Sequence, residues 1–511
     1  MTSLDNLRRQ AKTLKKAYDA GDPVARQRIR AHAPRNDGFA LKHADFLHVI
    51  AREAQFASWP RLKFAAETVG LDRADKQQRL KVALYHGRNW AVEQLLAETP
   101  DLADGLFGLQ VALYDLGAVR RALQADPDLA TRAAGPRTPI LHLAFSRYIH
   151  AHPEKEADMI AIAELLLAHG ADINDGMPES DGSDHKLSAL YGAIGHTNNM
   201  PLAKWLLEHG ANPNDNESLY HATELGHHDG LKLLIEHGAD PKGTNALLHA
   251  LDYNDAQAVR LLLAAGANAN EGVSVHPSGQ PEHVIAALHQ AARRMCDGAI
   301  ARLLIDAGAN PSASFFGVTP YALARVYGND AVADEIAQAG GDTTLSEVER
   351  LLVKAARGEA NEGVYVDPAP LPHIYGNLIG ELSHLPGKLE HMKQLVALGL
   401  EYDRPDAMGV TPVQSAGWQG RPEVMTYLLS LRPDLSHVNN YGGTLLGTII
   451  HGSENCERRA ERDHITCARL ALEHGVALLR HDIDAAGNQE MSEFLRDWAE
   501  NHPGQVIQSG V

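Results

Sequence analysis

The sequence predicts an all-α solenoid of stacked helix–turn–helix units, preceded by a helical amino-terminal cap. Three observations predict this fold. Aromatic residues make up only 5% of the 511 residues, which favours helices packed through small side chains over an aromatic-rich β-sandwich. An apolar helical segment followed by His-Gly-Ala or Ala-Gly-Ala, and then by Asp or Asn, recurs through the middle of the chain. A second helix start accompanies these copies, so each unit is two antiparallel helices and a turn.

The recurring segment predicts where the second helix of each unit ends. Its copies read AELLLAHGADIN, AKWLLEHGANPN, LKLLIEHGADPK, VRLLLAAGANAN and ARLLIDAGANPS, with turn glycines at Gly170, Gly210, Gly238, Gly266 and Gly308. These glycines are 40, 28, 28 and 42 residues apart. A glycine ends a helix in a left-handed conformation that residues with a Cβ resist. No single unit closes a core, so several units must stack.

The first helix of each unit also has a start signal. It is visible in the segments RTPILHLA (137–144), NALLHAL (245–251), ALHQAA (287–292), VTPYALA (318–324) and VTPVQSA (410–416). Thr319 and Thr411 can cap a helix, because a threonine hydroxyl accepts a hydrogen bond from a free backbone N–H. Pro320 and Pro412 then occupy the first helical position, where a missing N–H costs nothing.

These segments resemble the ankyrin repeat, whose hallmark is Thr-Pro-Leu-His-x-Ala followed by Leu-Leu-Leu-x-x-Gly-Ala-Asp, with a period of about 33 residues. The resemblance is specific over residues 137–345 and again over 409–476. The whole chain is similar to the long ankyrin-repeat proteins common in bacteria. The resemblance implies a binding surface on the concave inner helices and on the fingers between units.

The repeat pattern divides the chain into four parts. Residues 1–70 form a helical amino-terminal cap, and residues 71–345 form a repeat array whose first two units are degenerate. Residues 346–400 are either degenerate helical units or a break in the stack. Residues 401–511 hold the carboxyl-terminal repeats and a second helical cap.

The net charge and the cysteine content indicate which classes of partner and which cellular compartment to expect. Lys and Arg total 47 against 65 Asp and Glu, a net charge of −18, so bulk charge will not hold this chain to nucleic acid. The same charge favours a protein partner with basic patches. Three cysteines without a CxxC pair indicate neither a disulfide framework nor a thiolate zinc site. With no signal peptide and no apolar run of 18 residues, we expect a cytoplasmic protein without a membrane span.

No familiar catalytic signature is present. The sequence lacks GxxxxGK[ST], GxGxxG, HExxH and GxSxG, the motifs of several phosphate-, dinucleotide-, zinc- and serine-based sites. Catalytic residues therefore stay unknown, and we expect no cofactor and no bound metal. A protein that is not an enzyme is favoured.

Candidate binding residues come from the inner helices. Tyr220 and Leu248 occupy the position where the repeat has its histidine, so His221 and His249 come one residue later, at a position that faces the concave side in this repeat family. Tyr191 and the pair His289–Gln290 continue this row. In the carboxyl-terminal part we add Trp418 and His451, the latter placed directly after an inner helix at the start of a polar loop over 451–464.

Two functions are compatible with such a row. The first is a binding module that recognises a protein partner through the concave inner-helix face and the fingers. The alternative is a small-molecule or metal site in a groove lined by Tyr and His, which could also be catalytic. Two long fingers, over 173–187 and 271–284, would flank either site. A closed pocket formed by these side chains would favour the alternative.

Overall fold

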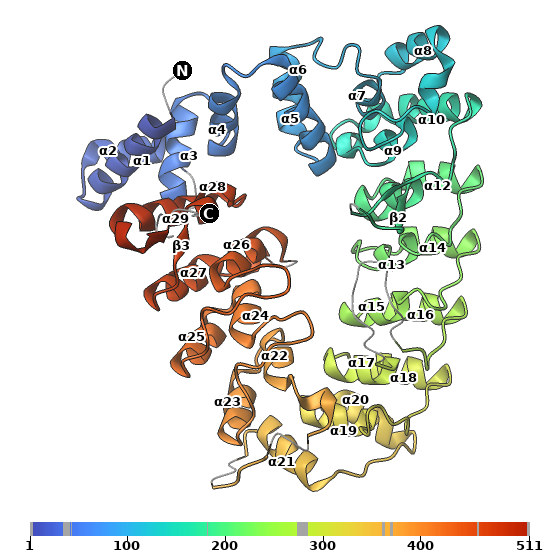
Figure 1. Cartoon of the computed structure of the whole chain (residues 1–511), viewed down its shortest axis with the longest axis vertical. Helices are drawn as coiled ribbons and strands as arrows, with labels where there is room; N and C mark the ends of the chain where they lie inside the picture. The colour runs from blue at the N-terminus through green and yellow to red at the C-terminus, as the bar shows by residue number, and fades with distance from the viewer. Residues whose placement is uncertain are drawn as a thin grey trace. The chain divides into compact units, whose positions relative to one another are not determined.

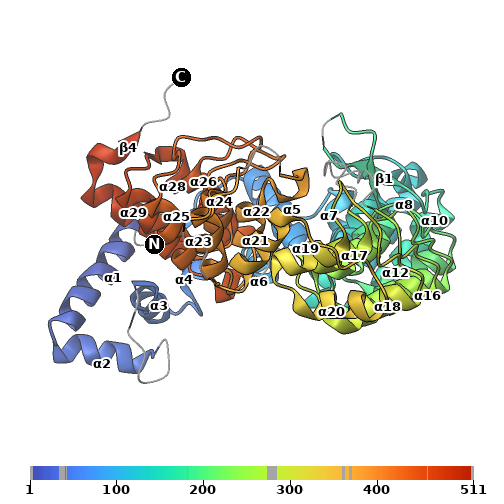
Figure 2. The ribbon, with the colours of Figure 1, turned by 90° about the horizontal axis from the view of Figure 1, so that it is seen from below.

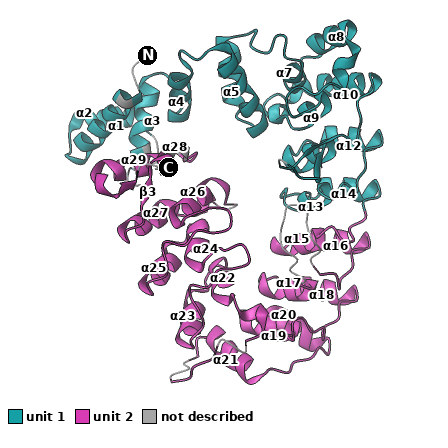
Figure 3. Ribbon diagram, in the orientation of Figure 1, with its two compact units in different colours: residues 1–239 teal, residues 240–511 magenta. Residues whose placement is uncertain are grey.

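The computed structural model describes residues 4–33, 41, 43–180, 182–272, 285–359, 363–367, 371–456 and 459–507. It divides into two compact units, residues 1–239 and residues 240–511 (Figure 3). Helices make up most of both units, which confirms the predicted all-α solenoid. The finer domain boundaries drawn from the sequence stay a prediction.

Unit 1 is a succession of short helices with one small hairpin (Figure 1). Its elements are α1 (Leu4–Asp19), α2 (Pro23–Ala31), α3 (His43–Glu53), α4 (Trp59–Thr68), α5 (Arg73–His86), α6 (Asn89–Glu98), α7 (Phe107–Ala112), α8 (Leu116–Ala125), η1 (Pro127–Ala130), α9 (Pro139–Ala144), η2 (Arg147–His150), η3 (Pro153–Lys155), α10 (Glu156–Ala168), β1 (Gly176–Pro178), β2 (Lys186–Ser188), α11 (Ala189–Tyr191), the π-helical turn η4 (Gly192–His196), α12 (Met200–Glu208), α13 (Ser218–His221) and α14 (Asp229–Glu236).

The first helices of unit 1 have a core of their own. Helices α1, α2 and α3 pack against one another (Figure 2). The apolar stripe of α1 supplies Leu7, Ala11 and Leu14 to this core, where they meet Phe46 and Leu47 of α3. A helix with apolar residues every three or four positions buries one face, as the sequence predicts for this segment.

The rest of unit 1 stacks in two layers. The first helices of successive helix–turn–helix repeats pack side by side, and we call them inner helices; they are α7, α9, α11 and α13. The second helices, α8, α10, α12 and α14, form the other layer. The finger predicted over 173–187 is a β-hairpin, in which β1 and β2 pair antiparallel with Met177 opposite Leu187.

Unit 2 continues with the same kind of element (Figure 1). It contains α15 (Ala246–Asp252), α16 (Ala256–Ala264), α17 (Ala287–Arg293), α18 (Gly298–Asp306), α19 (Pro320–Tyr327), α20 (Asp330–Gln338), α21 (Glu347–Ala356), η5 (His373–Tyr375), α22 (Leu378–Ser383), α23 (Leu389–Ala397), α24 (Pro412–Trp418), α25 (Pro422–Ser430), α26 (Leu445–Asn455), η6 (Arg459–Glu461), α27 (His464–Glu473), β3 (Leu478–Leu479), α28 (Arg480–Ala485), α29 (Gln489–Asn501), η7 (Pro503–Gln505) and β4 (Val506–Ile507).

Within unit 2 the inner helices α15, α17 and α19 stack in order, and α22, α24 and α26 form a second row. Helix α21 lies between these rows in the sequence and packs against both α19 and α23. The described residues of the segment 346–400 thus carry α21, η5, α22 and α23, although the repeat motif there is blurred. The second long finger, predicted over 271–284, lies outside the described residues from 273 onward.

The predicted turn and cap residues act as expected. The five turn glycines have φ between 87° and 99°, a conformation that favours glycine because it has no Cβ. The hydroxyl of Thr319 accepts a hydrogen bond from the Ala322 N–H at 3.1 Å. Thr411 forms a capping box with Gln414, in which each side chain accepts from the other's backbone N–H.

Candidate binding surface on the inner helices

In unit 1, three predicted residues lie on two neighbouring inner helices. Tyr191 ends α11, and Tyr220 and His221 end α13. The His221 ring lies 5.0 Å from the ring of Tyr191 and 5.1 Å from that of Tyr220, measured between centroids. The predicted residues of this unit therefore form one aromatic cluster.

His221 is held between two carboxylates. Its Nε2 lies 3.0 Å from Glu217 Oε2, and its Nδ1 lies 2.7 Å from Glu224 Oε1. Burial alone would lower the pKa of His221, but the hydrogen bonds to Glu217 and Glu224 raise it to about 9. Both ring nitrogens donate when the imidazole is protonated, so at neutral pH this histidine is a cation bound at both ends.

The hairpin finger adds a second histidine to this cluster. His185 Nε2 lies 2.6 Å from Glu217 Oε1, so the carboxylate of Glu217 contacts one imidazole through each oxygen. Only 3% of the Glu217 side chain is exposed. A buried carboxylate needs such partners, because leaving it unpaired would cost several kcal/mol.

Sequence reasoning missed Glu217, Glu224 and His185. A signal for the first two was available: they lie four residues before and three residues after His221, and such spacings place side chains on the same helix face. No comparable signal marks His185, because its contact depends on how the hairpin folds back.

Tyr191 is packed from several sides. A Cβ at Gly195 would lie 2.7 Å from the Tyr191 ring and 2.8 Å from His221 Cβ, so only glycine fits without a shift of these side chains. Burial raises the pKa of the Tyr191 phenol, and the carboxylate of Glu217 adds to this effect. Tyr191 is therefore a neutral hydrogen-bonding group at any ordinary pH.

In unit 2, His289 is a buried part of the scaffold. Its Nε2 lies 3.0 Å from the carbonyl oxygen of Val318, in the next loop. Burial lowers the pKa of His289 to about 4, so the ring is neutral and donates to this carbonyl. His249 lies on the preceding inner helix, α15, with its ring edge-on to that of Tyr253 and the ring centroids 5.2 Å apart.

Gln290 belongs to a polar network on the inner helices of unit 2. Its amide nitrogen donates to Asp252, and its amide oxygen accepts from Arg293 at 2.7 Å. Asp252 also accepts from Arg294 Nε at 2.8 Å. These residues satisfy one another's hydrogen bonds, which fixes their geometry.

Trp418 and His451 meet on α24 and α26, with ring centroids 5.1 Å apart. The prediction that a loop begins at His451 is wrong, because α26 continues to Asn455. The close approach of Gly452 to the Trp418 backbone allows these two helices to pack, since a Cβ there would lie 2.4 Å from the Trp418 carbonyl oxygen.

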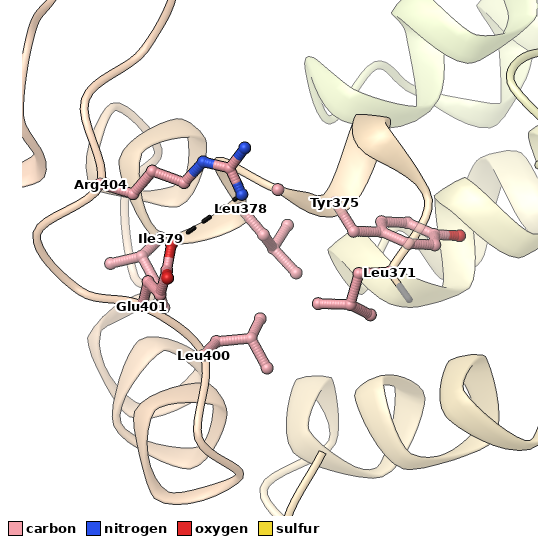
Figure 4. A pocket seen from close by; sticks show the side chains of 8 residues that line it. Leu371, Tyr375, Leu378, Ile379, Leu400, Glu401 and Arg404 are labelled. Atoms are coloured by element: carbon pink, nitrogen blue, oxygen red, sulfur yellow. Dashed lines mark ion pairs between the residues drawn. The ribbon is translucent and has the colours of Figure 1, made fainter. Parts of the chain in front are cut away.

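The candidate residues do not line the cavities found in unit 2. One cavity, of about 10 Å³, lies between η5, α22 and the loop after α23 (Figure 4), and it has room for about one water molecule. The Arg404–Glu401 ion pair lies at its edge. Another, of about 420 Å³, lies beside α28 and α29. Its lining residues are Arg480, Ile483, Arg496, Ala499, Glu500, Pro503 and Val506.

The described ranges contain neither a metal-like cluster nor a helix suited to a membrane. No group of three or more His, Cys, Asp or Glu side chains there is arranged to hold a metal ion. No helix in the same part of the chain combines the length and apolar character that crossing a bilayer requires.

Comparison with known proteins identifies the repeat. Residues 190–273 match the family model described as ankyrin repeats in three copies. No curated protein matches the sequence. The fold is thus an all-α solenoid that contains ankyrin repeats, a type of repeat that generally mediates protein–protein interaction.

Solved structures similar to this chain are themselves ankyrin repeat domains. The ankyrin repeat domain of Bcl-3, described as a unique member of the IkappaB protein family, is 24% identical in sequence to this chain, with a TM-score of 0.35. The match covers 46% of this chain and 98% of the Bcl-3 domain. The ankyrin repeat domain of human ASB11 is 20% identical, with a TM-score of 0.24 over 49% and 96%. One from Acinetobacter baumannii AYE is 27% identical, with a TM-score of 0.29 over 38% and 99%.

Proposed function

We propose that this chain is a non-enzymatic binding module that recognises a protein partner through its inner helices and fingers. The observation that carries this proposal is the match of residues 190–273 to ankyrin repeats, which generally act in this way. The matched segment includes Tyr191, Tyr220 and His221. Tyrosine is enriched at interface centres, because one ring supplies a large contact area at low entropic cost.

The charges of the cluster around His221 support a partner with basic side chains. Two carboxylates, Glu217 and Glu224, share this imidazolium, and a third of the Glu224 side chain is exposed. A partner lysine or arginine placed beside Glu224 would gain a charge-assisted hydrogen bond. Because the cluster is already hydrogen-bonded, little ordering cost would accompany binding.

The same proposal places the chain in the cytoplasm of a bacterium. The three cysteines support a reducing compartment, because Cys296, Cys456 and Cys467 are all free. The bacterial origin rests on the resemblance of the whole sequence to long ankyrin-repeat proteins of bacteria.

The second candidate function is the binding of a small molecule at this cluster, which could then also be an active site. The observation that favours it is the hydrogen-bonded line from Glu217 through His221 to Glu224, which could bind a polar ligand or pass a proton. Two observations weigh against it. His221 is already protonated near neutral pH, whereas a general base should titrate there. The ring nitrogens of His221 are also both taken up by carboxylates of the same unit.

Affinity capture from the source lysate tests the leading proposal. The bait is the full chain, compared with a Tyr220→Ala/Glu224→Gln variant of the inner helices. A Lys232→Ala/Glu236→Gln variant on the outer helix α14 is the matched control. We expect a near-stoichiometric protein with wild type and control that is lost with the inner-helix variant. If wild type retains no protein, the proposal is wrong; a metabolite found by native mass spectrometry instead would support the second candidate.

A further inference from the structure

Arg137 lies in the loop before α9 and is fixed over two aromatic rings. Its guanidinium carbon lies 4.5 Å from the ring centroid of Tyr85 and 5.1 Å from that of Phe145. Its Nε donates to the sulfur of Met177, in the hairpin finger, at 3.2 Å. Contacts with two rings and with the finger hold the planar guanidinium in one place.

In the part of the chain that the structure describes, the terminal nitrogens of this guanidinium donate to no protein oxygen. Among the described residues, no carboxylate pairs with Arg137, and its two terminal nitrogens have no acceptor although neither is buried. Other half-buried arginines of the chain differ. Arg147 donates to the carbonyl oxygen of His196, and Arg325 pairs with Asp330 and Asp334. Arg137 is therefore a preorganised donor that is still available.

The surroundings of Arg137 are positive in a chain that is acidic overall. Burial lowers the pKa of His86, His142 and His196, and the charges that add to this lowering are all cationic. These positive charges are those of Lys81, Arg88, Arg137 and Arg147. The charge of His86 also lowers the pKa of His196. An anion placed at Arg137 would meet these cations, while the nearby carboxylate of Asp175 accepts hydrogen bonds from the Thr138 hydroxyl and the Gly176 N–H.

The positive region is short, because acidic groups follow along the same unit. Tyr191, whose ring lies 6.0 Å from that of Phe145, is already within the field of Glu217, Glu224 and Glu179. A long polyanion would run from the cations into these carboxylates. A single acidic side chain, followed by neutral or basic ones, fits both regions.

We propose that Arg137 anchors a single carboxylate from a short segment of a protein partner, with Tyr85 and Phe145 positioning the guanidinium. The two free terminal nitrogens form the fork that binds a carboxylate through both oxygens. This inference rests on the proposed function and adds an acidic residue to what the partner must present.

Defined peptide libraries test the inference without knowledge of the partner. Random 12-residue peptides that carry one aspartate or glutamate among neutral and basic residues are immobilised beside matched peptides with asparagine or glutamine in its place, and both are probed with the full chain at low salt. The key variant is Arg137→Met, which keeps the packing on the rings but removes the fork. Arg137→Lys keeps the charge alone. Arg132→Ala is the matched control, because it removes a cation from the same loop that already pairs with Asp126 at 2.9 Å.

We expect wild type to prefer the peptides with a carboxylate over their amide-matched counterparts, and Arg137→Met to bind the preferred peptides at least about tenfold more weakly, as for loss of a charge-assisted hydrogen bond. Arg137→Lys should fall between the two, and Arg132→Ala should match wild type. Equal binding by Arg137→Met, or equal binding of the carboxylate peptides and their amide-matched counterparts by wild type, would overturn the inference. Competition by inorganic phosphate but not by acetate would assign the site to phosphate and also overturn it.

Failure here is distinguishable from failure of the proposed function. If a partner captured from lysate by wild type is retained equally by Arg137→Met, the module stands and the Arg137 anchor falls. If lysate yields no partner while an Arg137-dependent preference for the carboxylate peptides persists, the anchor stands and the proposed partner binding falls.

Discussion

Replacing Glu217 with glutamine should lower the pKa of His221 and weaken the fold of the inner helices. The substitution keeps the size of the side chain and removes only its charge. Glu217 contacts His185 and His221 through its two oxygens, at 2.6 and 3.0 Å. Glu224 keeps its contact with the other nitrogen of His221 in the variant, so the imidazole loses one of two carboxylates.

The expected magnitude follows from the pKa of His221. The rise from 6.5 to about 9 corresponds to roughly 3 kcal/mol at about 1.4 kcal/mol per pKa unit. The less exposed Glu217 should supply at least half of this, because solvent screens the pair with Glu224 more strongly. We therefore expect the pKa of His221 to fall by about 1–2 units, with a loss of about 1–3 kcal/mol in stability near pH 6.

The sign of the pH dependence is also fixed. A histidine whose pKa is higher in the folded chain stabilises the fold fully below its unfolded value of 6.5. That contribution is lost as the pH rises through about 9. Wild type should thus lose stability between these limits, and the difference between wild type and Glu217→Gln should shrink over the same range.

Histidine-selective NMR of the full chain measures this pKa directly. The signal that disappears in His221→Gln identifies the ring, and its titration is followed in wild type, Glu217→Gln and Glu224→Gln. Urea unfolding at pH 6 and pH 9.5 gives the matching stability difference. An unchanged His221 pKa in Glu217→Gln, or a larger effect of Glu224→Gln, would refute the reasoning.

Two further substitutions probe the scaffold. Gly195→Ala should destabilise unit 1 by about 1–3 kcal/mol, because its Cβ would overlap the Tyr191 ring; Gly117→Ala, whose nearest neighbours lie at 3.4 Å or more, should be neutral or stabilising. Thr411→Ala removes the capping box with Gln414 and should cost about 1 kcal/mol. Urea midpoints check both, and equal midpoints for the two glycine variants or no shift for Thr411→Ala would contradict these expectations.

Local signals in the sequence determined the repeat fold. Helix ends depend on nearby residues: Gly170 and its equivalents adopt positive φ, and Thr319 and Thr411 cap the helices that follow. Such signals act within a few residues and need no tertiary context. A helix without a strong stop signal is harder to bound, and α26 accordingly runs past His451 to Asn455.

The candidate surface was only partly predictable. The sequence identified Tyr191, Tyr220 and His221, which do cluster in unit 1. It did not identify Glu217 as the buried group that binds this cluster together, nor Arg137 as an available cation. It also did not separate His221 from His289, although one is a cation between carboxylates and the other a neutral donor to a loop carbonyl.

The class of fold follows from the residues alone, because helix periodicity, caps and turn glycines act over short distances and repeat along the chain. The charge state and availability of each polar side chain are set by the folded structure. These depend on burial and on partners far away in sequence, such as His185 in the finger against Glu217, or Tyr85 beneath Arg137. The strength of an electrostatic interaction changes when the distance between two charges changes by a few ångströms. Within each part of the chain, these distances are set only when successive repeats pack against one another.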